Sequence, residues 1–189
     1  MSAPDMHEKC NAMLHAAVTL NPKVQKMIDS IEALGCTIPK SFFICRPCDA
    51  EISGGFNVGS SQTKESGYQP QIIVCENNIL EKETFEHTIV HELVHAYDVC
   101  RAKLDFADCA QHACTEIRAS SMSGECSILH EVFRGKLKRL AGGQKDCVQR
   151  RAIKSLQMNP NCQAIADKAV SDAFTECYAD QCPLVDKKA

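Results

Sequence analysis

The chain has 189 residues, of which 44% are hydrophobic and 24% are charged, and its formal net charge is −3. These values are ordinary for a globular protein of one domain, with room for an added lobe. The small negative charge gives no reason to expect a nucleic-acid partner, and no apolar run reaches the roughly 18 residues of a membrane-spanning helix.

The first part of the chain predicts two helices followed by short strands. Residues 5–36 carry apolar side chains at helical spacing, with a break where Pro22 can start the second helix. Ser41–Cys45 and Gln71–Cys75 are strand candidates, and the second is bounded by turn residues and rich in β-branched ones. Between them, residues 53–71 are rich in Gly, Ser and Gln, which predicts strand fragments in a loop or hairpin.

From about Glu81 the sequence predicts helices almost to its end. Gly-Gly and Asn-Pro-Asn segments separate the later ones. The expected helices span residues 81–100, 108–123, 126–140, 145–157 and 161–180.

Thirteen cysteines make up about 7% of the chain, whereas the amino-terminal segment lacks the apolar core of a secretion signal. Cysteine-rich proteins usually occupy oxidising compartments, which most proteins reach with a signal peptide. Two interpretations remain. The protein either keeps its thiols reduced in the cytosol or nucleus, or enters a compartment such as the mitochondrial intermembrane space, where import and oxidation are coupled.

The cysteine spacing allows several arrangements. Cys147, Cys162 and Cys177 lie fifteen residues apart, which suits disulfides that staple the helices of a hairpin but can also be coincidence. Cys45 and Cys48 form a single CxxC pair, which favours disulfides over a metal knuckle because no second CxxC exists to complete a four-cysteine site. The odd total leaves at least one cysteine outside an intramolecular bridge.

The motif HExxH occurs at residues 91–95 within the helix predicted over 81–100. At 100° per residue, one side of this helix carries histidines and an aspartate, and the opposite side is apolar. The polar side comprises His87, His91, His95 and Asp98, and the apolar side comprises Phe85, Ile89, Leu93, Ala96 and Cys100.

His91 and His95 are neighbours on the helix surface, since residues i and i+4 lie about 5–6 Å apart. Two imidazoles at this spacing can converge on one Zn²⁺ ion. Glu92 points to the flank of the helix, where it can act as the general base toward a water molecule at the metal. The alternative is an ordinary helix whose histidines are solvated.

A catalytic zinc needs a third protein ligand, for which Glu116 is the best candidate. Asp108 and Gln111 are typical of a capping box that opens its helix, and a glutamate about twenty residues after the second histidine is typical of glutamate-type zincins. His112 is the second candidate, and a surface carboxylate is the alternative for Glu116. We expect Asp98 to orient an imidazole from outside the ligand set, unless it is simply exposed.

The block from His91 to Ser127, with HELVHAYDVCRAKLDFADCAQHACTEIRASSMSGECS, resembles the mitochondrial inner-membrane-associated zinc peptidases that process and help assemble the Fo sector of ATP synthase. The likeness extends from about Cys36 to about Cys182. The chain departs mildly from this pattern at Phe106, Thr115 and Met122, and the tail after Cys182 is unlike the endings of the family.

The resemblance implies a zinc endopeptidase of the mitochondrial intermembrane space, attached peripherally to the inner membrane and imported through the oxidative relay. Its substrate would be the precursor of ATP synthase Fo subunit a, whose assembly the family also assists independently of proteolysis. One Zn²⁺ per chain would be bound by His91 and His95 with Glu92 as catalytic residue, and Glu116 lies in the family's glutamate-containing helix motif. Several disulfides would account for the cysteines.

We therefore expect an α+β, zincin-like metallopeptidase of the glutamate type, with a small sheet, an HExxH helix and a disulfide-rich helical C-terminal lobe. Residues 1–140 would form the catalytic domain with its N-terminal helices, and residues 141–189 the cysteine-bearing lobe. The edge of the segment Gly54–Gly59 is a candidate for binding extended substrate, with the backbone N–H of Asn57 as one contact. The competing function is a non-catalytic assembly chaperone that retains the zinc fold.

Overall fold

The computed structural model describes residues 3–49, 51–59, 70–78, 81–127 and 143–185. The chain divides into two compact units, Met1–Arg101 and Ala102–Ala189. The domain boundary expected after residue 140 and nearly all of the helix expected over 126–140 lie outside the described residues, so both stay predictions.

The described part of the first unit contains three helices and three short strands. In chain order they are α1 (Ala3–Leu20), α2 (Pro22–Ala33), β1 (Phe43–Arg46), β2 (Gly54–Asn57), β3 (Gln71–Cys75) and α3 (Lys82–Ala102). The predicted break between the first two helices is confirmed, because Pro22 begins α2 and the Asn21 side chain caps it. Within the described residues, no helix has both the length and the apolar composition needed to cross a membrane.

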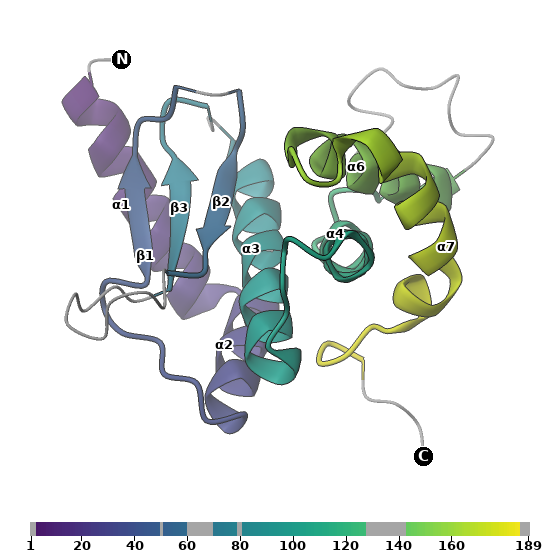
Figure 1. Ribbon diagram of the computed structural model, residues 1–189. Coiled ribbons are helices and arrows are strands. Elements are labelled where there is room, and N and C mark those ends of the chain that lie inside the picture. The colour runs from purple at the N-terminus through teal and green to yellow at the C-terminus, as the bar shows by residue number, and fades with distance from the viewer. Residues whose placement is uncertain (1–2, 50, 60–69, 79–80, 128–142, 186–189) are drawn as a thin grey trace. The chain divides into compact units, whose positions relative to one another are not determined.

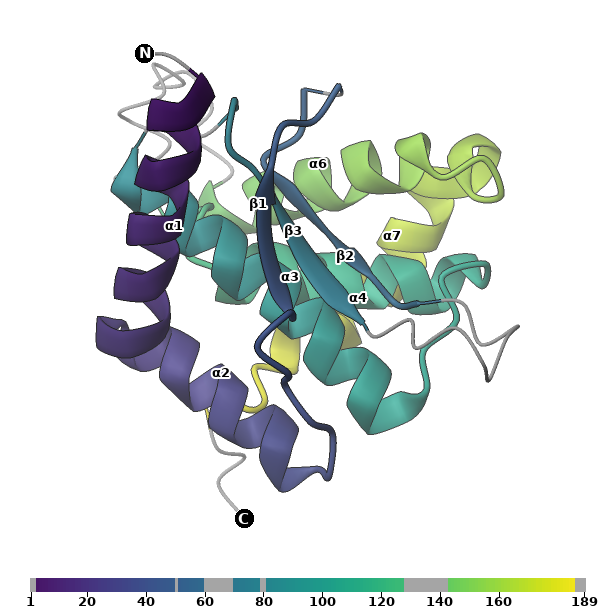
Figure 2. The same ribbon diagram turned by 90° about the vertical axis from the view of Figure 1, so that its left-hand side faces the viewer.

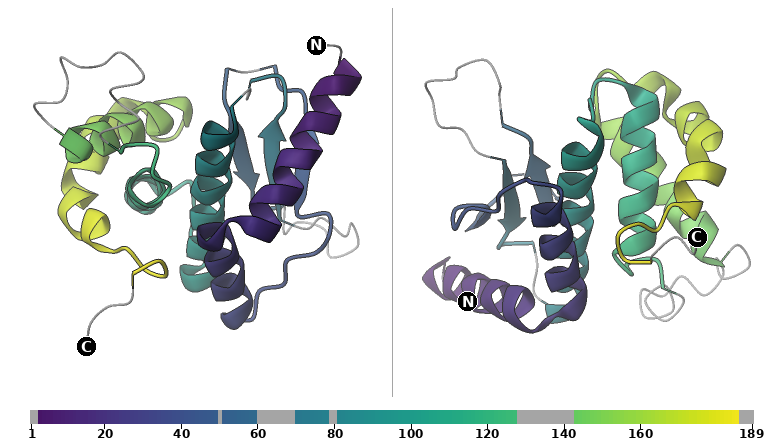
Figure 3. Two further views of the ribbon diagram at one scale, coloured as in Figure 1. Left: turned by 180° about the vertical axis from the view of Figure 1, so that it is seen from behind. Right: turned by 90° about the horizontal axis from the view of Figure 1, so that it is seen from below.

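The three strands form one sheet in the order β1-β3-β2. β1 is parallel to β3, and β2 is antiparallel to β3 and forms an edge of the sheet. Figures 2 and 3 show α1 and α3 along one face of this sheet. In β3, Ile72 and Val74 are completely buried, whereas Ile73 between them is only half-buried, as the alternation of a strand requires.

The apolar side of α3 is packed as its sequence predicts. Phe85, Ile89 and Leu93 have no exposed surface, and Ala96 is 6% exposed. Cys100 differs, because it is half-buried at the end of the helix, where a disulfide joins it to Cys36. This packing fixes the rotation of the helix about its axis and hence the direction of the histidine side.

The second unit is a group of helices: α4 (Cys109–Met122), α6 (Gly143–Met158), the short 3-10 helix η2 (Gln163–Ile165) and α7 (Ala166–Ala179). α4 lies beside α6 and α7 in Figure 1 and in both views of Figure 3. The helices share an apolar core that includes Ile117 of α4, Leu156 of α6 and Val170 of α7, all fully buried. The α+β class with a small sheet is thereby confirmed.

Six disulfides use twelve of the thirteen cysteines, and each lies within one unit. The first unit contains Cys10–Cys45, Cys36–Cys100 and Cys48–Cys75. The second contains Cys109–Cys162, Cys114–Cys177 and Cys126–Cys147.

The two CxxC cysteines bond to different partners, which confirms the predicted disulfides there. The three cysteines at fifteen-residue spacing also form disulfides, but only Cys177 joins one helix to another, by bonding to Cys114 of α4. Cys162, between α6 and η2, bonds to Cys109 of α4, and Cys147 of α6 bonds to Cys126, just after α4. Each bridge contributes on the order of 2–4 kcal/mol to the free energy of unfolding.

We expect one titratable thiol per chain when the protein is denatured without reductant, because only Cys182 is outside a disulfide. The measurement is a thiol count with Ellman's reagent, and Cys182→Ser should lower the count to zero. A count close to the full number of cysteines would contradict the disulfide set and restore the reduced cytosolic interpretation.

Candidate metal centre

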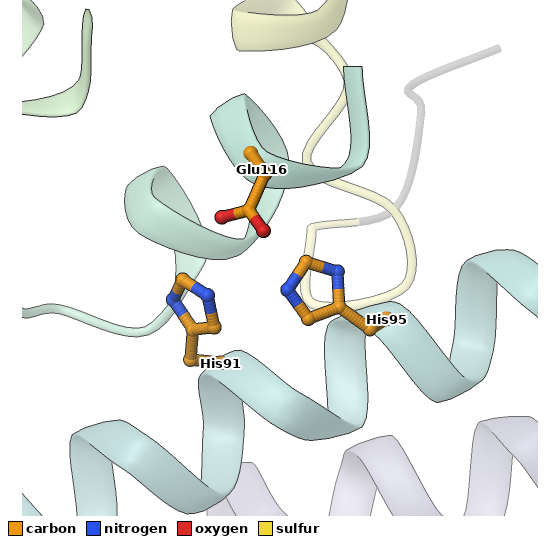
Figure 4. A group of neighbouring side chains, drawn as sticks. All are labelled: His91, His95 and Glu116. Carbon is orange, nitrogen blue, oxygen red and sulfur yellow. The ribbon is translucent and has the colours of Figure 1, made fainter. Parts of the chain in front are cut away.

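Helix α3 places His91 and His95 one turn apart on the same side. Their ring centroids are 4.9 Å apart and the ring planes are inclined by 75°. In Figure 4 both imidazoles project from consecutive turns toward a common point. This is the arrangement expected for residues i and i+4, and it lets one nitrogen of each ring approach the same ion.

Three side chains could together hold a metal ion: His91, His95 and Glu116. Each offers one ligand atom, and these atoms all lie within 4.8 Å of one another (Figure 4). His91 is half-buried, whereas His95 and Glu116 are buried. Two imidazoles and one carboxylate are a donor set that Zn²⁺ accepts in catalytic sites, so the residues present fit the ion.

Glu92 lies beside the edge strand of the sheet. The side chain is 7% exposed, and an ideal Cβ built on Gly54 of β2 would lie 3.8 Å from its Cγ. The same Cβ would lie only 2.8 Å from Thr88 Cγ2 and from the backbone oxygen of Ile73. Only a residue without a side chain allows β2 to pass this close to the helix that carries Glu92.

Asp98, expected to orient an imidazole, is paired with an arginine. It is 2% exposed, and its Oδ1 lies 3.1 Å from Nη2 of Arg101, one turn further along α3. Its predicted role beside the histidines therefore stays a prediction. His87, Asp98 and His112 do not belong to the group that could hold the ion.

Glu116 stands on α4, whose start is capped as the sequence predicts. The Asp108 side chain accepts hydrogen bonds from the backbone N–H groups of Ala110 and Gln111. These bonds, and a side-chain bond from Gln111, lower the pKa of Asp108. The box is modified, since Gln111 Oε1 accepts from the backbone N–H of Asp105 and not from that of Asp108.

Two side chains of the same unit contact the Glu116 carboxylate. Ser155 on α6 donates a hydrogen bond of 2.6 Å to Oε1, and His112 Nε2 lies 3.4 Å from the same oxygen. His112 thus lies next to the carboxylate. Sequence reasoning missed Ser155, because nothing local marks one serine of α6 as the partner of a residue 39 positions earlier. Gly54 could have been noticed, since it belongs to a Gly-Gly pair in a strand candidate.

Comparison of the sequence with known proteins identifies a family for this chain. The family model described as Peptidase M76 family matches residues 8–185. The mitochondrial inner membrane protease ATP23 homolog of Xenopus laevis is 35% identical over 181 residues, covering 94% of this chain and 73% of that protein. The corresponding protein of Schizosaccharomyces pombe is 34% identical, and the match covers 94% of this chain and 91% of that protein. The homolog of Homo sapiens is also 34% identical, and the match covers 94% of this chain and 70% of that protein. No solved structure matches the chain.

We expect Gly54→Ala to destabilise the first unit by about 1–3 kcal/mol, the usual effect of overpacking, because the added methyl group meets backbone and a β-branched side chain. Gly55→Ala is the matched control, since a Cβ at Gly55 meets nothing within 4 Å. Urea unfolding followed by circular dichroism compares the two variants. Equal stability of both would show that β2 does not pass as close to α3 as described.

Proposed function

The chain belongs to the peptidase M76 family, and on that premise we propose that it is a zinc-dependent endopeptidase. We place it in the mitochondrial intermembrane space, peripherally on the inner membrane, where it processes the precursor of ATP synthase Fo subunit a and assists its assembly. The names of the relatives support the inner-membrane location. The observation that carries the enzymatic proposal is the grouping of the ligand atoms of His91, His95 and Glu116 within 4.8 Å.

His91, His95 and Glu116 would hold one Zn²⁺ ion per chain. When bound, this ion supplies a Lewis acid that polarises the scissile carbonyl and lowers the pKa of a water molecule. The two imidazoles are held by a helix whose apolar side is buried, so little conformational entropy is lost when they bind the ion.

Glu92 would move the proton. Its carboxylate takes a proton from the attacking water as the new C–O bond forms, and it gives that proton to the amide nitrogen as the C–N bond breaks. The side chain is buried beside β2, where an extended substrate would exclude water and strengthen electrostatic interactions with the reacting groups.

The edge strand β2 would bind the substrate by strand addition. Residues directly opposite in an antiparallel pair alternate between hydrogen-bonded and non-hydrogen-bonded pairs. The backbone N–H of Cys75 donates to the oxygen of Ser53, so the pairs at Gly55–Ile73 and Asn57–Gln71 are also of the hydrogen-bonded type.

This alternation corrects the expected substrate contact. The backbone N–H of Asn57 points toward β3 and not to the free edge. The outward N–H groups of β2 are therefore those of Gly54 and Phe56.

A second candidate function is a non-catalytic assembly chaperone that keeps the metal site as part of its fold. Both functions can belong to one protein. They differ in what they require of Glu92: proteolysis needs its carboxylate as a base, whereas a chaperone needs only that the fold persists.

We expect Glu92→Gln to reduce cleavage of the subunit a precursor by about 10²–10⁴-fold, the usual effect of losing a general base, without loss of zinc. The measurements are precursor cleavage by purified protein and metal content by elemental analysis. The double variant His91→Ala/His95→Ala is the comparison, and it should lose both precursor cleavage and bound zinc. Cleavage by Glu92→Gln at the wild-type level would overturn the mechanism. Loss of cleavage with intact subunit assembly in mitochondria would show a separate chaperone activity.

We expect Phe56→Pro to raise KM for peptide substrates about fivefold relative to Phe56→Ala, because it removes one outward N–H worth about 1 kcal/mol. Proline is tolerated on the free edge of a strand, and Phe56→Ala controls for the lost ring. Steady-state kinetics of both variants decide the question. Equal KM values would exclude backbone pairing at this position.

A further inference from the structure

The buried carboxylate of Glu116 is oriented from within the second unit. It is 5% exposed, and its Oε1 accepts the hydrogen bond from Ser155 Oγ at 2.6 Å. The same oxygen lies 3.4 Å from His112 Nε2. A buried carboxylate is costly without hydrogen-bond donors, and two contacts on one oxygen also restrict rotation of the group about its last side-chain bond.

Asn159, just after the end of α6, determines which ring nitrogen of His112 faces a hydrogen-bond donor. Its Oδ1 accepts from the backbone N–H of Asn161 at 3.0 Å, and its Nδ2 donates to the backbone oxygen of Phe106 at 2.9 Å. These two backbone contacts fix which end of the amide is nitrogen, and this nitrogen lies 3.0 Å from His112 Nδ1. Nδ1 of the neutral ring must then be the acceptor, so Nε2 carries the hydrogen and directs it at Glu116.

A disulfide joins the segment that carries Asn159 to the helix that carries Glu116. Cys109 at the start of α4 is bonded to Cys162. The backbone N–H of Cys162 donates to the oxygen of Asn159 at 2.9 Å, and Cys109 Sγ lies 3.5 Å from the oxygen of Asn161. The segment that carries Asn159 is thus covalently joined to the helix that carries both His112 and Glu116.

We propose that Ser155 and Asn159 are positioning residues for the metal site, and that they hold the Glu116 carboxylate in its ligand orientation, Ser155 directly and Asn159 through His112. This inference rests on the proposed role of Glu116 as the third zinc ligand. It assigns the disulfide-bonded C-terminal helices a part in metal binding. Partners that orient a ligand typically change metal affinity by about 10–100-fold when removed.

The other side chains of α6 in this region serve a different purpose. Ala152 and Leu156, on either side of Ser155 in the sequence, are fully buried in the apolar core of the unit. Ser155 itself is only half-buried and donates to the carboxylate. Removal of its hydroxyl oxygen therefore takes away one donor and leaves the packing of the core in place.

The test is zinc affinity, measured by competition with a chromogenic chelator, together with the visible spectrum of the Co²⁺-substituted protein. Ser155→Ala should weaken Zn²⁺ binding about 10–100-fold and alter the Co²⁺ bands. Ser155→Thr keeps the hydroxyl group and should bind close to the wild-type level. Ser171→Ala, an exposed serine of α7, is the matched control and should change nothing. Asn159→Ala should weaken binding in the same direction.

Two further variants separate the possible failures. If Ser155 acts through Glu116, Ser155→Ala should add no further loss in a Glu116→Ala background. Zinc binding by Glu116→Ala at the wild-type level would remove Glu116 from the ligand set and overturn the proposed site together with this inference. The positioning role alone would be overturned if Glu116→Ala bound Zn²⁺ weakly while Ser155→Ala bound it as tightly as the control Ser171→Ala. An equal loss from Ser155→Ala in both backgrounds would show a merely structural role and also overturn it.

Discussion

Phe85, Ile89 and Leu93 are fully buried along α3, and their burial determines where the two imidazoles point. Each such side chain contributes roughly 1.5–3 kcal/mol by leaving water, so a rotation of the helix that moved the histidines would expose this apolar surface. The ligand geometry is therefore a consequence of packing on the opposite side of the same helix. The position of Glu92 follows from it, because a residue next to the first histidine must lie on the flank, where Gly54 leaves room for it.

Disulfides add to the apolar cores of the two units. A unit of about a hundred residues buries a limited fraction of its surface, so its apolar core alone supplies limited stability. Three bridges in each unit restrict the unfolded chain and so raise the free energy of unfolding. In the second unit, they also bring α4 together with the segments that orient its buried carboxylate.

The sequence predicts well what depends on neighbouring residues. The HExxH helix, its buried side, the Pro22 start of α2 and the Asp108 cap all follow from periodicity and capping within one segment. The helix that carries Glu116 and the face that this residue occupies on it are likewise local properties, whereas its proximity to His91 and His95 is set by tertiary structure.

The rest depends on pairing between distant segments. The partner of each cysteine, the sheet order and the register of β2 are set by tertiary structure, and one step of register reverses which N–H groups reach an edge. For this reason the sequence-based expectation that the backbone N–H of Asn57 faces the free edge of the sheet is wrong. The partnership of Ser155 with Glu116 leaves no sequence signal at all.

No disulfide crosses the division of the chain after Arg101, and this limits the number of incorrect pairings among the cysteines of each unit. Six cysteines precede that point, and six cysteines can be paired in only fifteen ways, far fewer than for the whole set. Cys100 is the last of them, so a chain oxidised progressively from its amino end can complete its first three bonds before Cys109 becomes available to compete. Under that order of oxidation, the cysteines of the second unit cannot compete for the bonds of the first unit.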